Sequence, residues 1–74
     1  MNAHSDRLLD RLLSPKDTLE YLQTRYGIHI SLASLYTMIS RGDSPNVTYF
    51  RGRPKFTVAD IDEWVRNNLS DNRK

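Results

Sequence analysis

The 74-residue sequence contains no cysteine, which excludes a disulfide framework and any metal site built from thiolates. The absence of cysteine also agrees with an intracellular location. Long apolar runs are missing as well, because Asp and Arg interrupt the leucine pairs near the N-terminus. Neither a membrane span nor a signal-peptide core is expected from such a sequence. We therefore expect a cytoplasmic protein that contacts no membrane.

Acidic residues are absent from one stretch, Ser44 to Ala59, in which Arg51, Arg53 and Lys55 fall within five positions. The net charge of the whole chain is only +2, so the position of the charge is more informative than its total. A local cluster of cations is the kind of patch that meets phosphate groups. The sequence therefore predicts a contact with nucleic acid in this stretch.

Groups that support metal binding or catalysis are also scarce. His4 and His29 are isolated, without partners at ligand spacing, so no metal site is expected. Asp60 and Glu63 form an acidic pair at the start of a predicted helix, where acids ordinarily complement the helix dipole, and no nucleophile accompanies them. We expect a protein that is not an enzyme and that uses no cofactor.

Hydrophobic residues make up 38% of the chain and charged residues 27%, which is ordinary for a globular domain and too apolar for a disordered one. A domain of this length buries only about 60% of the surface of its unfolded chain. We therefore expect one small domain with a small core. The large side chains of Tyr21, Tyr26 and Trp64 are expected to pack rather than to stack on bases.

The first predicted helix covers residues 15–26. Ser14 is a favourable N-cap, Pro15 suits the first helical position, and Asp17 can reach back as in a capping box. Gly27 suits the left-handed residue that closes a helix. The apolar stripe of this helix consists of Leu19, Leu22 and Tyr26.

A second helix is predicted to begin after Ser31 and to end at Gly42. Its spacing places Leu35, Met38 and Ile39 on a buried stripe. Two helices joined by a short connector indicate a helix-turn-helix.

A hairpin is predicted to follow, with strands over 47–50 and 55–57 and a turn over 51–54. The sequence Arg51-Gly52-Arg53-Pro54 in this turn resembles an AT-hook, an extended peptide that lies in the minor groove of A·T-rich DNA. Two phenylalanines, Phe50 and Phe56, bracket the turn and are expected to pin both strands to the core. The segment is therefore interpreted as a folded wing, not as a free hook.

A third helix is predicted over 58–69, because Thr57 and Asp60 form a cap signature. Trp64 is expected to be the largest core side chain of the domain. The predicted apolar face of this helix consists of Val58, Ile61, Trp64, Val65 and Leu69.

The N-terminal sequence DRLLDRLL, residues 6–13, places four leucines along one side of a short helix. We expect the last two, Leu12 and Leu13, to cover the core, and the alternative is an oligomerisation helix. The predicted organisation is an N-terminal tail or short helix over 1–11, a winged helix-turn-helix domain over 12–69 and a disordered tail over 70–74. The fold class is mainly α with a small β-hairpin, made of three helices plus a two-stranded wing.

Taken in order, the segments LLSPKD, ISLASLYTMISRGDSP and YFRGRPKFTVADIDEW resemble the AlpA and excisionase group of small DNA-binding proteins, relatives of the winged helix-turn-helix domain of MerR regulators. The resemblance covers residues 12–69. It implies that the second helix enters the major groove and that the wing touches the backbone or the minor groove.

The function implied by the resemblance is that of an excisionase, a recombination directionality factor that binds and bends attachment-site DNA cooperatively. Copies of the chain would associate along the DNA and help a partner integrase to excise a phage or genomic island. The protein would then be associated with the nucleoid of a bacterial or phage-infected cell. Two alternatives stay open: a transcriptional regulator of the AlpA kind at a promoter operator, and a protein-interaction module that uses the N-terminal leucines.

The candidate DNA-binding residues lie in three places. The second helix has short polar and apolar side chains on its outward positions, so direct reading of bases is expected to be modest. Arginines of the wing suit a narrow minor groove. The candidates are Leu32, Ala33, Ser34, Tyr36, Thr37, Ser40 and Arg41 on the second helix, Tyr49, Arg51, Gly52, Arg53 and Lys55 on the wing, and Lys16 at the start of the first helix.

Overall fold

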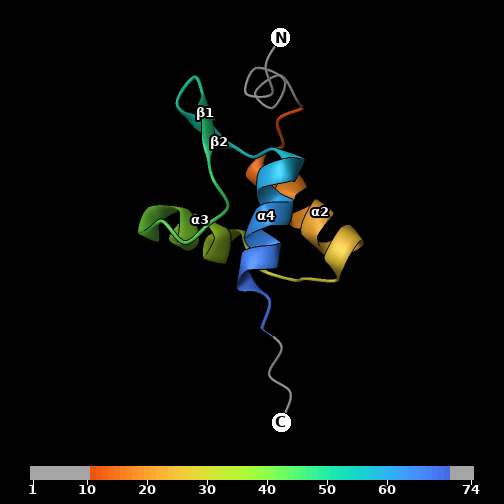
Figure 1. The fold of residues 1–74 in the computed structure, drawn as a ribbon. Helices are drawn as coiled ribbons and strands as arrows, with labels where there is room; N and C mark the ends of the chain where they lie inside the picture. The colour runs from red at the N-terminus through yellow and green to blue at the C-terminus, as the bar shows by residue number, and fades with distance from the viewer. Residues whose placement is uncertain (1–10, 71–74) are drawn as a thin grey trace.

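The structure, a computed structural model, describes residues 11–70 (Figure 1). The order of elements along the chain is helix α2 (Pro15–Tyr26), helix α3 (Leu32–Arg41), strand β1 (Thr48–Phe50), strand β2 (Arg53–Lys55) and helix α4 (Val58–Asn68). The two strands pair in an antiparallel sheet. The predicted fold class, three helices with a helix-turn-helix and a two-stranded wing, is confirmed.

Two predictions concern residues that the structure does not describe. The tail or short helix at the N-terminus includes Leu8 and Leu9, and these residues lie outside the described range, as do residues 71–74 of the predicted C-terminal tail. Within residues 11–70, no helix is both long enough and apolar enough to cross a membrane.

All three helices begin at the predicted caps. The hydroxyls of Ser14, Ser31 and Thr57 each accept a hydrogen bond from the backbone N–H three residues later, at 3.0 to 3.1 Å. Such a bond satisfies one of the N–H groups that a helix leaves free at its start. Helices α2 and α3 end at Gly27 and Gly42, whose positive φ of 70° and 79° is the conformation that glycine adopts at least cost.

The hairpin differs from the prediction in its register. Strand β2 begins at Arg53 rather than at Lys55, so the turn contains only Arg51 and Gly52. The physical reason is that both turn residues have positive φ, 53° and 79°, as a tight two-residue hairpin turn requires. The hairpin is therefore tighter than predicted, and Phe50 pairs with Arg53 directly beside the turn.

Of the two phenylalanines predicted to anchor the hairpin, only Phe56 does so, and the prediction for Phe50 is wrong. Phe56 is fully buried, whereas 57% of the Phe50 side chain is exposed. The cause is position: Phe56 lies just after β2, where two backbone hydrogen bonds of 2.7 and 2.9 Å join it to Leu13. Phe50 lies at the other end of the hairpin. One phenylalanine anchors the wing at its base, and the other projects from its tip.

The core lies where the three helices meet the base of the hairpin, and its buried apolar residues are Leu13, Leu22, Leu35, Phe56, Ile61 and Val65. Leu12 is half-buried, so the expected cover from the last two leucines of DRLLDRLL is seen mainly for Leu13. Most of the predicted stripes of α2 and α3 face this core, with Leu22 and Leu35 fully buried, but Met38 is only half-buried and does not belong to the core cluster.

The predicted apolar face of α4 is too wide. Val58 is 40% exposed and Leu69 is 71% exposed, because they lie in the first turn and just beyond the last turn of a helix that buries its middle. Trp64 is only half-buried, and Phe56 is the largest fully buried side chain instead. The indole N–H of Trp64 explains its position, since it donates to the backbone carbonyl of Asp43 at 2.7 Å.

The elements divide the molecule into two sides. Figure 1 shows α4 running through the middle, with α2 on one side of it and with α3 and the hairpin on the other. Helices α2 and α3 contact each other as the two helices of a helix-turn-helix. Helix α3 and the projecting hairpin therefore lie on the same side of α4.

Candidate nucleic-acid interface

Every candidate residue that periodicity assigned to the outer face of α3 is exposed. These residues are Leu32, Ala33, Ser34, Tyr36, Thr37, Ser40 and Arg41. The largest is Tyr36, which is 48% exposed. Most of the others are small, so the backbone of α3 could approach a groove floor closely. The structure thus brings together on one helix face the set that the sequence predicted there.

Two hydroxyls on this face already make internal hydrogen bonds. The Thr37 hydroxyl donates to the carbonyl of Ala33 at 3.0 Å, and the Ser34 hydroxyl accepts from that of Ser31 at 2.9 Å. Each hydroxyl has one proton to donate. Thr37 is therefore left as an acceptor, whereas Ser34 can still donate its proton to an acceptor on a ligand.

The start of α3 also differs from the starts of the other two helices. Helices α2 and α4 carry an acid in the first turn, Asp17 and Asp60, whereas the first turn of α3 has none. An acid there would compensate the partial positive charge of the helix N-terminus and would repel phosphate. The exposed start of α3 keeps its positive partial charge.

The turn at the wing tip has a backbone conformation that is unfavourable for one of its two residues. Both turn positions have positive φ, for which Asn-Gly is the preferred pair. Gly52 suits this conformation. Arg51, with a φ of 53°, adopts the left-handed backbone conformation, in which a Cβ lies too close to the following carbonyl oxygen. An arginine is therefore held at the tip at a cost in local stability.

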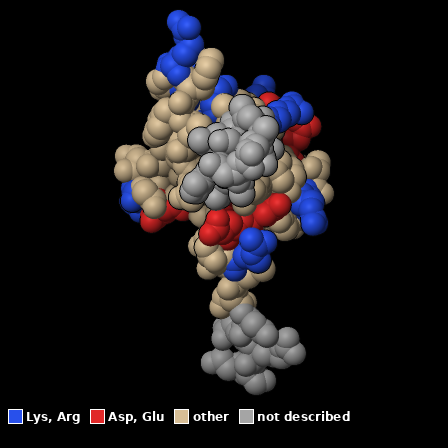
Figure 2. Space-filling view, turned by 45° about the horizontal axis from the view of Figure 1, so that its top comes forward, with Lys and Arg blue, Asp and Glu red and all other residues tan. Residues whose placement is uncertain are grey.

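The other candidate residues of the wing are spread along it. Arg53 is exposed beside the turn, and Tyr49 is 61% exposed on the opposite face of the hairpin, where it pairs with Pro54. Lys55 pairs with Thr48 at the base of the hairpin and is half-buried. Figure 2 shows basic side chains at the end of the arm that projects from the top of the molecule.

Charge is divided between the two sides of the fold. The segment 32–55, which contains α3 and the hairpin, carries four basic residues and one acidic residue. Helices α2 and α4 together carry three basic and five acidic residues. Lys16 is exposed, but it lies in the first turn of α2, among the more acidic helices. Such an uneven distribution of charge orients a molecule in the field of a polyanion.

A polar cluster that the sequence analysis missed joins α2 to α4. The hydroxyls of Tyr21 and Tyr26 both donate to one carboxylate oxygen of Asp62, at 2.7 and 2.6 Å. The two rings meet edge to face with centroids 6.2 Å apart, and the Arg25 guanidinium lies 5.1 Å from the Tyr26 ring centroid. Tyr21 and Tyr26 are five residues apart. This spacing does not predict that both hydroxyls bond to Asp62, which lies 36 residues after Tyr26.

The pKa values of this cluster follow from its hydrogen bonds. Burial and the bond to Asp62 raise the pKa of Tyr21 to about 12, and the bond to Asp62 also raises the pKa of Tyr26. Burial would raise the pKa of Asp62, but the hydroxyls of Tyr26 and Tyr21 and the nearby arginines outweigh it, so this pKa lies below its ordinary value. The cluster is thus a carboxylate held in its charged form by two phenols.

Neither a metal-binding group nor the two best-formed hollows of the described chain coincide with the candidate interface. Among residues 11–70, no group of three or more His, Asp and Glu side chains could hold a metal ion. Two shallow hollows of about 270 and 320 Å³ border α4 and α2, and neither is lined by residues of α3 or of the hairpin strands. The exposed face of α3 and the wing tip therefore stand apart from both hollows.

The elements and the surface of residues 11–70 together define a small domain of three described helices in which a helix-turn-helix carries a cationic wing. Comparisons with protein-family models, with curated proteins and with solved structures find no significant match for this chain. The likeness to the AlpA and excisionase group stays a prediction from the sequence.

Proposed function

We propose that this protein binds double-stranded DNA, with the outer face of α3 in the major groove and the hairpin beside it. The observation that carries the proposal is Arg51, an arginine kept in a left-handed position where asparagine or glycine would be more stable. Residues held in sparsely populated conformations concentrate at functional sites. A guanidinium at the tip of a two-residue turn is well suited to a narrow groove with negative potential.

The contacts of the two elements differ in kind. Arg51 and Arg53 enter the minor groove or meet the phosphates that border it, while the uncompensated N-terminus of α3 and Arg41 meet phosphates of the major groove. Leu32 and Ala33 contact thymine methyl groups, and Ser34 donates a hydrogen bond to a base edge. Phosphate contacts supply most of the affinity in this arrangement, so sequence selectivity is modest.

The role in the cell that best fits a weakly selective binder is the excisionase role implied by the resemblance. Several copies bound to neighbouring sites would gain the affinity that one small interface lacks, and a partner integrase would use the bent DNA. A regulator of the AlpA kind would use the same surface on one operator. The arrangement of binding sites separates the two roles.

The experiment exposes the purified protein to a random pool of duplex DNA at physiological salt and sequences the retained molecules. The double variant Arg51→Ala/Arg53→Ala is the control, since both side chains are exposed and their loss leaves the core intact. Repeated half-sites at a fixed spacing, absent with the control, support the excisionase role, and single sites support a regulator. Equal and poor retention of both proteins contradicts DNA binding.

A further inference from the structure

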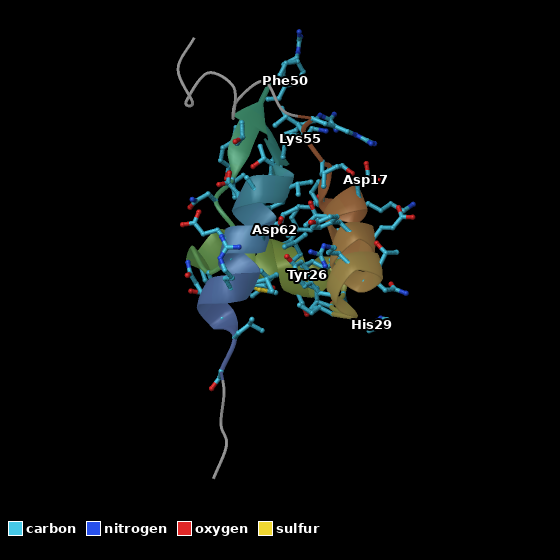
Figure 3. The ribbon with its side chains drawn as sticks, turned by 45° about the vertical axis from the view of Figure 1, so that its right-hand side comes forward. Asp17, Tyr26, His29, Phe50, Lys55 and Asp62 are labelled. Atoms are coloured by element: carbon cyan, nitrogen blue, oxygen red, sulfur yellow. The ribbon has the colours of Figure 1, made fainter. Side chains whose placement is uncertain are left out.

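Phe50 is the one large apolar side chain that the wing places directly beside its turn. It is 57% exposed, and its cross-strand neighbour is Arg53. Figure 3 shows Phe50 at the far end of the hairpin, beyond the three helices, while Lys55 lies closer to the body of the domain. An exposed phenylalanine is unremarkable by itself. What singles out Phe50 is its position between two arginines at a projecting tip.

We infer that Phe50 is a wedge that inserts between two base pairs in the minor groove and kinks the DNA. The inference rests on the proposed DNA binding and names the residue through which the wing would deform its target. Phenylalanine is among the side chains that proteins insert between base steps from the minor groove, where they partly unstack the bases and bend the duplex.

The dimensions of the hairpin fit this role. Paired strands lie about 4.8 Å apart between their backbone axes, so a hairpin with its side chains is wider than the minor groove of about 6 Å, and only its end can reach the groove floor. The end comprises the turn, Arg51-Gly52, and the first cross-strand pair, Phe50 and Arg53. Tyr49 belongs to the next pair and to the opposite face of the hairpin, so it lies further from the floor.

The chemistry around Phe50 is also complementary to a deformed duplex. A kink towards the major groove opens the minor groove at the wedge, and the two phosphate backbones then lie on either side of the inserted ring. Arg51 follows Phe50 in the sequence, and Arg53 pairs with Phe50 across the sheet. Each arginine can therefore meet the phosphates on one side of the wedge. No acid lies between Ser44 and Ala59 to oppose this approach.

The same geometry selects a base step. Pyrimidine–purine steps such as TA are the easiest to unstack, and A-tracts on either side of such a step narrow the minor groove there and attract guanidinium groups. The favoured target is therefore a TA step within A·T pairs. A step within G·C pairs offers neither property and serves as the reference.

The test uses duplexes that carry 2-aminopurine in place of the adenine of a central TA step, because the fluorescence of this base rises when it is unstacked. Bending is measured in parallel by moving the same step along a fragment and comparing gel mobility. The proteins are the full chain, Phe50→Ala, Phe50→Leu and Leu69→Ala. Leu69 is the matched control, since it is another exposed apolar residue, 71% exposed, at the opposite end of α4 from the hairpin.

The expected result is a rise in fluorescence and a bend of roughly 20–90° with the full chain, both lost in Phe50→Ala. Phe50→Leu keeps an apolar wedge and retains most of both signals, and Leu69→Ala behaves as the unchanged protein does. The affinity of Phe50→Ala for the TA duplex falls roughly tenfold. Its thermal unfolding stays close to that of the full chain, because Phe50 lies outside the core.

Three results would overturn the inference and leave the proposed DNA binding in place. Salt-dependent binding of the full chain without unstacking or bending would leave DNA binding in place and remove the wedge. Equal bending by Phe50→Ala would do the same. A change in the sedimentation of free Phe50→Ala without a change in bending would make Phe50 a contact between protein molecules. Failure of the full chain to bind any duplex would instead remove the proposed function together with the inference.

Discussion

The two sides of this domain are stabilised by different means. Helices α2 and α4 are joined by apolar packing around Leu22 and Ile61 and by two short hydrogen bonds to Asp62. The hairpin is attached to the rest mainly at its base, where Phe56 pairs with Leu13, and its tip extends into solvent. The packed helices and the hairpin base hold the fold together, and the hairpin tip presents charge without contributing much to stability.

The difference shows how a small core can support a projecting element. Phe56 ends the hairpin on the core, so three residues of each strand suffice to hold the tip at a fixed place. The tip can then carry residues that lower local stability, such as an arginine with positive φ. Binding residues on such elements are positioned by a rigid scaffold.

The largest expected effect contrasts the two phenylalanines. Phe56→Ala should lower the free energy of unfolding by about 3–5 kcal/mol, since it removes the largest fully buried side chain. Phe50→Ala should change it by no more than about 0.5 kcal/mol. Denaturant unfolding followed by circular dichroism measures both. Phe56→Leu, with an expected loss of about 1–1.5 kcal/mol, keeps the test usable if the alanine variant does not fold.

The next effect concerns the polar joint between α2 and α4. Asp62→Asn should lower the free energy of unfolding by about 1–2 kcal/mol at neutral pH, because two hydrogen bonds lose their charged acceptor. The pKa of Asp62 is lowered in the folded protein, so its contribution is present above the unfolded pKa of about 3.9 and is lost as the pH falls through the folded value. The variant should therefore lose less stability than the parent in acid.

One control variant and one further variant accompany this comparison. Tyr36→Phe removes the hydroxyl of a 48% exposed tyrosine on α3 and should leave the unfolding curve unchanged. Tyr21→Phe tests the alkaline side: the pKa of Tyr21 is raised to about 12, so its contribution is complete below pH about 10 and is lost as the pH rises towards 12. Equal acid sensitivity of Asp62→Asn and the parent would show that the joint is not a stabilising contact.

A gain in stability is expected from Thr18→Val. Thr18 is fully buried in α2, and its hydroxyl has no hydrogen-bond partner among the described residues. Valine has nearly the same shape without the unsatisfied polar group, so the free energy of unfolding should rise by about 1 kcal/mol. Thr24→Val is the matched control on the same helix, because its exposed hydroxyl already donates to the Glu20 carbonyl at 2.9 Å. A loss of stability in Thr18→Val would mean that the hydroxyl is paired.

The smallest change in stability is expected at the wing tip. Whether the free energy of unfolding rises or falls there is informative. Arg51→Asn places a residue that tolerates positive φ at the first turn position and should stabilise the hairpin by about 0.5 kcal/mol. The same variant should bind duplex DNA more weakly, since it loses a guanidinium. Thermal unfolding and DNA titration of one sample measure the two effects together. Unchanged DNA binding would contradict a functional reason for Arg51.

Local signals in the sequence predicted the helices well. The caps Ser14, Ser31 and Thr57 and the terminal glycines Gly27 and Gly42 each act within one turn, so their effect can be predicted without tertiary structure. Because Leu35 was predicted to lie in the core, the face of α3 that is exposed could be predicted as well. These features set both the helix-turn-helix and most of the candidate interface.

Most of the features that were mispredicted or missed depend on contacts between distant residues. The register of the hairpin is decided by the pairing of Phe56 with Leu13 and by the turn at Arg51, and the strand pattern alone allowed a longer turn. The shared acceptor Asp62 joins side chains 36 and 41 residues apart. Neither periodicity nor propensity carries information on such a pair.

The most direct test of the central claim is the salt dependence of duplex binding by the full chain and by Arg51→Ala/Arg53→Ala. If roughly three to five phosphates are neutralised, the logarithm of the association constant should fall with that of the salt concentration at a slope of about −3 to −4.5. The double variant should have a slope shallower by about 2. The same slope for both proteins, or no binding by the full chain at low salt, would contradict the wing as a DNA contact.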